Sequence, residues 1–492
     1  MSGVRRRARH RPVSRQSLRD GLFFATVAAL ILACLLGGGS SRPDILSLLY
    51  LRPVVIAAIG AILYLRGAEI RWRVVRAPLI LLGLMALLMI VQLVPLPPGL
   101  WARLPGHTEL YKQLQGVGLA QIWRPLSLAP EYTCNSLLSL LIPTAMILAV
   151  AGLRPSEYAW APFVLAGIGI LSALLGTVQL TMGVGYVYQY SDNTLPIGLF
   201  TNRNHQASFL AICLPALRIC SLRLRKDPKQ QIFQSILCAG IGLYFILTLI
   251  MTGSRSGLLV GTVGLIAAAA IGWHRRDGEA ASVGRKHATG RKRHRHIRVA
   301  VITGFAIAVI GLGGLAYLSG RGTALVRLQQ VDTIANDQRI TYAPITWQLT
   351  RDYFPTGIGF GAFDRVYRMN EPDWALHQSY FNHAHNDLVE LAMTGGAPAL
   401  LLLVTFLLWV AYATITIRRT GQNVSHDMIR GAQFAIAAII ILLLGSLADY
   451  PLRTPILAMV MGFAGALLAI GADAARQSRK PTYPSNDSLP CR

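Results

Sequence analysis

The sequence predicts an all-α fold, a polytopic membrane bundle of about twelve transmembrane helices. Charged residues make up 14% of the 492-residue chain, whereas an ordinary soluble domain carries about 25%. Apolar residues make up 53%. They gather in nearly uncharged blocks of about 18 to 22 residues, and a helix of that length spans the roughly 30 Å hydrocarbon core of a bilayer. The composition therefore excludes a set of soluble domains, a disordered chain, a coiled coil and a secreted disulfide scaffold.

Twelve such blocks are expected to cross the membrane and to form one bundle over 20–472. The first block follows a basic region, as a signal peptide would. It runs into a Gly/Ser stretch at 37–41 without a small-residue cleavage site, so we interpret it as a retained helix. The expected spans are residues 20–37, 46–65, 77–95, 134–152, 159–182, 204–222, 232–251, 256–273, 299–318, 398–417, 431–449 and 454–472.

The distribution of Lys and Arg sets the expected orientation. Segment 1–19 holds seven Arg, and placing it in the cytoplasm puts 33 of the 47 Lys and Arg on that side. Both termini are then cytoplasmic, and 473–492 is expected to be a disordered tail. The net charge of +25 is thus a topology signal that also attracts anionic lipid headgroups. No nucleic acid is expected as a partner, because no reading module accompanies the charge.

Two segments on the non-cytoplasmic face are too long to be simple turns. The Pro and Trp residues of 96–133 suit an interfacial loop with short helices. Segment 319–397 is a large loop, and loops of this length are usually functional. Within it, 338–354 begins as a helix, and the glycine run 357–361 is interpreted as a tight turn.

The cysteine and histidine patterns predict no metal site and no disulfide frame. The six Cys contain no C-x-x-C pair and lie mostly inside expected spans. The His-containing segment 274–298 is a basic loop on the cytoplasmic side, which we interpret as solvated.

Three polar clusters lie at the non-cytoplasmic membrane boundary. They are 198–205, the short turn 252–257, and the part of the long loop that holds Arg339, His383 and His385. Ionisable residues placed at a membrane boundary are costly unless they are hydrated or paired. These clusters are therefore the candidates for chemistry.

Arg255 is the most informative single residue, because its turn is only a few residues long and its charge opposes the inside bias. One interpretation is a snorkelling Arg that anchors a helix end. The other is an anion site, since a guanidinium fork matches phosphate oxygens and a Gly/Ser turn that opens a helix adds N–H donors. Arg203 and His205 have the same ambiguity. A structural role is favoured for this cluster, in which Asn202, Asn204 and Arg203 would cap and solvate the start of the span at 204.

His383 and His385 flank one alanine, so in an extended segment they face the same side. Some metal sites use this spacing, but no acidic or Cys partner has obvious ligand spacing. A general base is favoured, because a neutral imidazole accepts a proton near pH 7.

Taken together, the motifs resemble the O-antigen ligase/polymerase family of bacterial envelope glycosyltransferases over about 195–405. Their order and spacing carry the resemblance. One departure is Ala399, which stands where the family often has the second of two Gly spaced three apart, after Gly396. The motifs are Gly-Leu-Phe-Thr-Asn-Arg-Asn-His-Gln-Ala, Thr-Gly-Ser-Arg-Ser-Gly, Asp-Gln-Arg-Ile followed by Trp, Pro-Thr-Gly-Ile-Gly-Phe-Gly-Ala-Phe and His-Ala-His-Asn-Asp-Leu-Val-Glu-Leu.

The resemblance implies a GT-C-like fold in the bacterial inner membrane with its active face in the periplasm. It implies transfer of an undecaprenyl-pyrophosphate-linked glycan to an acceptor hydroxyl, without a metal or other cofactor. By motif, His385 resembles the family's catalytic base, and Arg255 and Arg339 resemble its pyrophosphate-binding residues. The expected accessory residues are Arg203, Asn204, His205, His383 and Asn386.

The chemistry of these residue types agrees with the resemblance. Two Arg would stabilise the charge that grows on a pyrophosphate leaving group, while a His takes the acceptor proton and the anomeric centre inverts. The acceptor is lipid A-core in a ligase or another glycan in a polymerase of O-antigen or exopolysaccharide. A flippase or a chain-length regulator would be a partner protein. A twelve-span solute transporter and a protein O-oligosaccharyltransferase are the alternatives.

Overall fold

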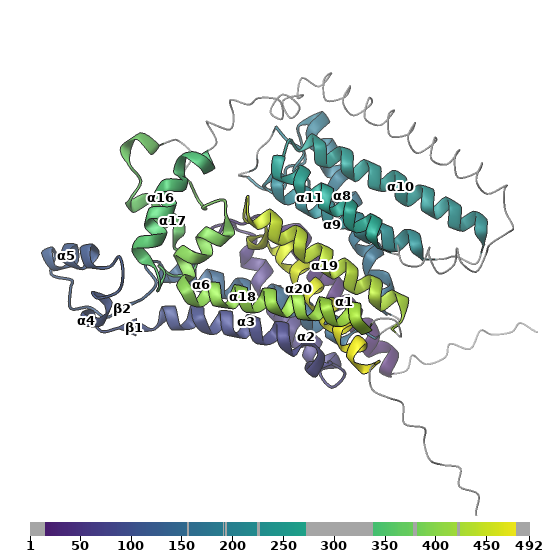
Figure 1. The fold of residues 1–492 in the computed structure, drawn as a ribbon, viewed down its shortest axis with the longest axis horizontal. Coiled ribbons are helices and arrows are strands. Elements are labelled where there is room, and N and C mark those ends of the chain that lie inside the picture. The colour runs from purple at the N-terminus through teal and green to yellow at the C-terminus, as the bar shows by residue number, and fades with distance from the viewer. Residues whose placement is uncertain are drawn as a thin grey trace, which may run out of the picture.

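The computed structural model shows an all-α polytopic membrane architecture (Figure 1). It describes residues 15–154, 157–189, 191, 194–223, 227–271, 338–376, 381–420 and 424–478. Ten helices in these ranges are long and apolar enough to cross a membrane, and α11 (Arg255–Ala270) is a shorter apolar helix. The expected span 299–318 and the basic loop 274–298 lie outside the described residues, so the count of twelve stays a prediction.

Each of the other eleven expected spans coincides with a helix or, for 134–152, with two consecutive helices. The long elements are α1 (Arg15–Gly37), α2 (Leu48–Arg66), α3 (Trp72–Leu93), α6 (Pro130–Ser139), α7 (Leu141–Gly152), α8 (Ala161–Met182), α9 (Arg203–Leu222), α10 (Pro228–Met251), α11, α18 (Asp387–Thr420), α19 (His426–Ser446) and α20 (Pro455–Gln477). The shorter ones are β1 (Pro95–Leu96), α4 (Pro98–Trp101), α5 (Thr108–Gly116), β2 (Arg124–Pro125), η1 (Glu157–Trp160), α16 (Gln338–Tyr353), α17 (Phe363–Met369), η2 (Asp373–Ala375) and η4 (Pro451–Arg453).

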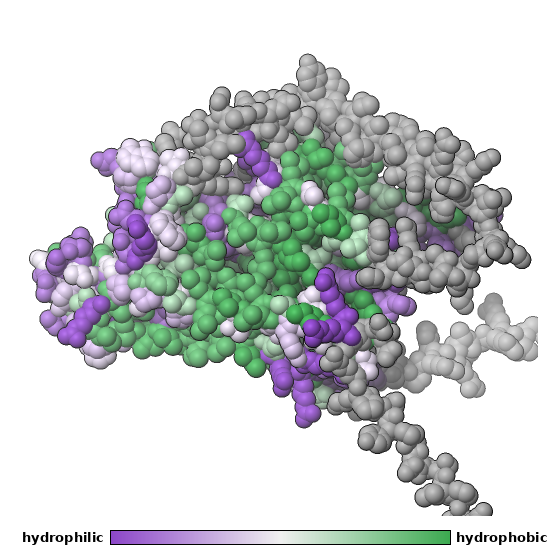
Figure 2. Space-filling model, in the orientation of Figure 1, coloured by the Kyte–Doolittle hydropathy of each residue, from purple (hydrophilic) through white to green (hydrophobic). Residues whose placement is uncertain are grey.

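Two apolar cores hold the bundle together. In one, α9 packs among α8, α10, α11 and α19, and nearly all its side chains from 204 to 220 are buried. In the other, α1, α2 and α7 pack together, and α20 contributes side chains to both cores. Hydrophobic residues cover the outer face over α3 and α18, as a membrane protein requires (Figure 2). Hydrophilic residues gather around α4, α5 and α16.

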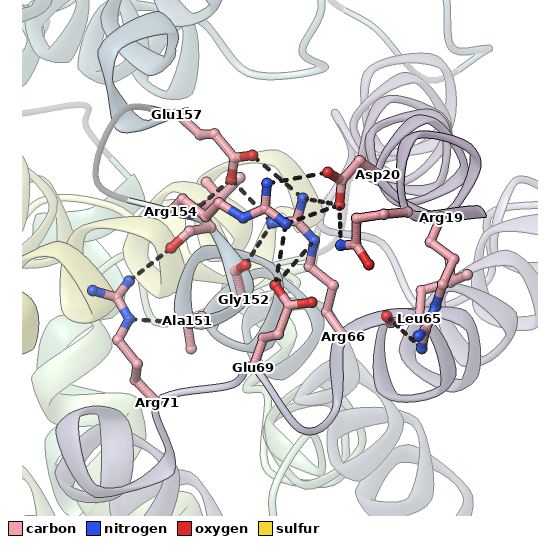
Figure 3. Close-up of polar contacts among 12 residues, drawn as sticks. Arg19, Asp20, Leu65, Arg66, Glu69, Arg71, Ala151, Gly152, Arg154 and Glu157 are labelled. Carbon is pink, nitrogen blue, oxygen red and sulfur yellow. Dashed lines mark hydrogen bonds and ion pairs between the residues drawn. The ribbon is translucent and has the colours of Figure 1, made fainter. Parts of the chain in front are cut away.

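A buried ion network closes the end of the bundle where α2 stops (Figure 3). Arg66, whose side chain is 0% exposed, lies 2.9 Å from Asp20 and 3.0 Å from Glu157, and it donates to Gly152 O at 2.8 Å. The charges come from α1, α2 and η1, and the carbonyl ends α7. Arg66 therefore ties four elements together at what we call the Arg66 end.

A small helical unit lies at the other end, which we call the α16 end. Its core combines aromatic side chains from α16 and α17 and Phe381 with aliphatic side chains such as those of Leu349 and Ile358. The glycine run forms a turn, as expected, and Gly357, Gly359 and Gly361 all have φ between 78° and 97°. Short helices α4 and α5 occupy the predicted interfacial loop.

The helix α18 begins eleven residues earlier than the expected span at 398. Gly396, whose φ of 63° and ψ of −158° kink the helix, separates the expected span from an additional half-helix that begins at Asp387. The expected span started at Pro398 and therefore left this half-helix out. From α3, Gln92 Nε2 donates to Thr394 O at 3.0 Å, and Phe360 N donates to Gln92 Oε1 at 3.1 Å. The kink is therefore fixed against both the glycine turn and α3.

Candidate active site

Four segments meet at the α16 end and bring most of the predicted site residues together. They are the first turns of α9, α11 and α18 and the α19–α20 connection. Ser254 Oγ donates to Asn204 Oδ1 at 2.6 Å, and Asn204 Nδ2 donates to Asp449 Oδ2. The other carboxylate oxygen of Asp449 lies 3.2 Å from His385 Nδ1. A continuous hydrogen-bond chain thus runs from the turn that holds Arg255 to His385.

Local sequence explains why three helices begin at this place. Ser254 caps α11, Asn202 caps α9 and Asn386 caps α18, each by accepting a backbone N–H bond of 2.8–3.0 Å. The capping interpretation of the first cluster is therefore confirmed for Asn202, whereas the Asn204 side chain bonds to Ser254 and Asp449. The positive ends of three helix dipoles lie close to one another, which favours an anion there.

Glycine residues on α11 let its first turn reach α9. A Cβ added at Gly257 would lie 2.6 Å from Ala207 Cβ, and one added at Gly264 would lie 2.5 Å from Ala211 O. Any side chain at these positions would push the helices apart. The close approach brings Ser254 to Asn204 and places exposed Arg255 at the site.

Asp449 is the hub of the cluster. It is buried, and its Oδ2 also accepts from Asn202 Nδ2 at 2.8 Å. An ionised carboxylate can only accept hydrogen bonds, so His385 Nδ1 donates and Nε2 keeps the lone pair. This tautomer is the one that a general base needs.

His385 has a strained backbone. Its φ of 50° makes it the one non-glycine residue with positive φ in the described part of the chain, and such a conformation costs about 1–3 kcal/mol. Its ring lies against Phe381 and Tyr450, with centroids 5.4 Å and 5.0 Å away. The side chain is 19% exposed, so a substrate can still reach it.

His383 belongs to a second carboxylate pair. Its Nδ1 lies 3.0 Å from Glu390 Oε1, and Arg453 Nη2 lies 3.1 Å from the same oxygen. Arg453 Nε lies 3.1 Å from Asp387. Burial opposes the charge of Arg453, but the two neighbouring carboxylates raise its pKa above the ordinary value.

Arg203 and His205 occupy the first turn of α9. His205 is fully buried, and its ring lies 5.3 Å from that of Tyr450. The segment before α9 is held by α8, where Gln179 accepts from Gly198 N at 2.7 Å and donates to Gly198 O at 2.9 Å. His205 is thus enclosed beside Tyr450, whereas Arg203 is partly exposed.

Arg339 lies in the first turn of α16, which packs against α18. Its side chain is outside the described residues, so its pyrophosphate role stays a prediction. In the described ranges, no group of three or more His, Cys, Asp and Glu side chains is placed to hold a metal ion.

Three residues of the site were not predicted from the sequence, namely Asp449, Tyr450 and Arg453, and Glu390 was given no role. One observation could have found the first three. Segment 449–453 is a short polar connection between two apolar spans at the same face as Arg255, so the cost argument that selected Arg255 applies to it equally.

Comparison with known families supports one of the classes of protein that this geometry allows. A family model described as O-antigen ligase matches residues 240–404. Residues 240–404 are thus similar to the O-antigen ligase family. At the level of the family, this supports a glycosyltransferase-like ligase or polymerase that takes a lipid-linked glycan donor and a glycan acceptor in a membrane. No curated protein matches the chain.

The range that matches the O-antigen ligase model and the hydrogen-bond chain overlap only in part. The matched range runs from α10 into α18 and holds Arg255, Arg339 and His385. Asn204 and Asp449 lie outside it, on α9 and after α19. The structure thus adds two partners from flanking parts of the chain to the matched region.

Proposed function

We propose that the protein is an inner-membrane glycosyltransferase with its active face in the periplasm. It transfers or polymerises an undecaprenyl-pyrophosphate-linked glycan onto an acceptor hydroxyl. The observation that carries the proposal is the hydrogen-bond chain from Ser254 through Asn204 and Asp449 to His385. It puts an oriented imidazole and a helix N-terminus that carries an Arg into one site.

In this mechanism, His385 Nε2 takes the proton of the acceptor hydroxyl, and the ionised Asp449 stabilises the imidazolium that forms. The acceptor oxygen bonds to the anomeric carbon as the bond from that carbon to the pyrophosphate oxygen breaks. Attack from the face opposite the leaving group inverts the anomeric centre. As the resemblance implies, the proposed reaction needs no metal.

The leaving group is undecaprenyl pyrophosphate, and negative charge grows on it as the bond breaks. Arg255 begins α11, where the backbone N–H groups and the helix dipole add positive potential. A guanidinium presents paired donors to phosphate oxygens. We assign Arg255 and Arg339 to the pyrophosphate, with Arg203 as an accessory cation.

The test is genetic and biochemical. The gene is deleted, and the deletion strain is complemented with wild type, His385→Ala, Arg255→Ala or the control His426→Ala, which changes a His at the Arg66 end of α19. Lipopolysaccharide and secreted polysaccharide are then compared on gels at matched membrane abundance. We expect His426→Ala to restore the glycans and the two site variants to fail.

The glycans that are lost on deletion show whether the acceptor is lipid A-core or another glycan. Loss of every O-antigen band with accumulation of polymerised lipid-linked glycan identifies a ligase. Single-unit lipopolysaccharide, or lost exopolysaccharide with intact lipid A-core, identifies a polymerase. Glycan pools that do not change on deletion, or full complementation by His385→Ala, would overturn the proposal.

A further inference from the structure

Glu390 is a buried carboxylate in the first turn of α18, and it holds the segment that precedes this helix. Its side chain is 1% exposed. Oε1 lies 3.0 Å from His383 Nδ1, and Oε2 accepts from Ala384 N at 2.9 Å. These two contacts fix the two residues that immediately precede His385.

The strained backbone of His385 needs this support. A non-glycine residue in the left-handed region persists only where its surroundings hold it. Glu390 fixes the chain on the amino-terminal side of His385, and the Asn386 cap fixes it on the carboxy-terminal side. Without the first anchor, His385 is free to relax to negative φ, which turns its imidazole away from Asp449.

Arg453 connects Glu390 to the segment that holds Asp449, the carboxylate that faces His385. It pairs with Glu390 and Asp387 in the first turn of α18. It also lies four residues after Asp449, in the connection between α19 and α20. These two ion pairs thus set the distance between the helix that follows His385 and the carboxylate that orients the ring.

We infer that Glu390, together with Arg453, is a positioning residue that holds His385 in its strained, Asp449-bonded conformation. The inference rests on the proposed function, in which His385 is the base. Glu390 is too deeply buried to touch the acceptor, so it acts through His385 alone. A misplacement of about 1 Å of a reacting group can cost about a hundredfold in rate.

The first experiment is a double-mutant cycle on the full-length protein in membranes, with lipid-linked glycan transfer as the readout. We expect Glu390→Gln to lower kcat about tenfold to a hundredfold with little change in KM. In the His385→Ala background, the same change should have no further effect on the residual rate. The control is Thr394→Val, one turn further on, which removes only a hydrogen bond to Glu390 O.

The second readout does not depend on activity. The rate at which diethylpyrocarbonate modifies His385 is followed by mass spectrometry, alongside thermal stability in detergent. Glu390→Gln and the milder Arg453→Lys should both raise that rate severalfold, while Thr394→Val should not. An unchanged rate in folded Glu390→Gln would overturn the inference. A raised rate in a protein whose His385→Ala variant is fully active would support positioning and refute the proposed function.

Discussion

Replacing Asp449 with Asn tests the hydrogen-bond chain at its centre. Both carboxylate oxygens accept, one from His385 and the other from Asn202 and Asn204. An amide has only one oxygen, so it can serve either the two Asn side chains or the imidazole. The two Asn donors favour the oxygen, which leaves the new NH₂ facing His385 Nδ1.

That orientation inverts the role of the imidazole. Nδ1 must then accept, so the proton moves to Nε2, and the nitrogen that faces the acceptor can no longer take a proton. The equivalent Asp-to-Asn change in the serine-protease triad lowers kcat about 10⁴-fold through the wrong tautomer. Here we expect a fall of about 10³- to 10⁴-fold, which is about 4–5.5 kcal/mol at 1.36 kcal/mol per factor of ten.

The assay measures single-turnover transfer from a lipid-linked glycan by purified protein. Asp427→Asn is the matched control, because it changes an exposed Asp at the opposite end of α19. Stability should change little in Asp449→Asn, since the size of the side chain and the Asn contacts persist. A folded Asp449→Asn protein with kcat within threefold of wild type would refute the assigned tautomer and with it the role of His385 as a base.

Three further predictions concern the scaffold. Arg66→Ala removes the buried partner of Asp20 and Glu157, although Asp20 keeps its ion pair with Arg154. The free energy of unfolding should fall by about 1–3 kcal/mol, measured as a lower Tm in detergent; an unchanged Tm would contradict the network. Burial lowers the pKa of His107, so the folded state binds its proton less readily than the unfolded state. Stability should therefore be greatest above pH 6.5 and decline as pH falls below it, and His107→Gln should flatten that profile in thermal melts. Gly264→Leu should force α11 from α9, cost about 1–3 kcal/mol and reduce glycan transfer, whereas Gly240→Leu, at an open position on α10, should do neither.

Local patterns predicted the helices because a span is a property of one stretch of sequence. The apolar block of α9 and the caps at Ser254 and Asn202 can all be recognised within a few residues. The same holds for His385, which motif resemblance selected. Each of these predictions needs only neighbours along the chain.

The missing partners of Asn204 and His385 are long-range pairings, whereas Glu390 lies only seven positions from its partner His383. Asp449 contacts Asn204, 245 positions away in the sequence, and His385, 64 positions away. The periodicity of a short stretch of sequence cannot predict such contacts. The α18 kink has a local part and a long-range part. Gly396 and Pro398 interrupt the helix locally, and the backbone there is held against the glycine turn, where Ala397 N donates to Pro355 O at 2.9 Å.

The placement of polar groups favours chemistry at one face over transport through the bundle. A carrier with a central site needs polar groups near the bilayer midplane that are available to a solute. In the described helices, the buried polar residues of α8 and α9 bond to one another instead. Ser172 Oγ donates to Gln206 Oε1 at 2.6 Å, and Gln179 bonds both backbone groups of Gly198. The interior polar groups thus hold the segment that precedes α9. The charged groups that could act on a substrate lie in the candidate active site, at the α16 end of the bundle.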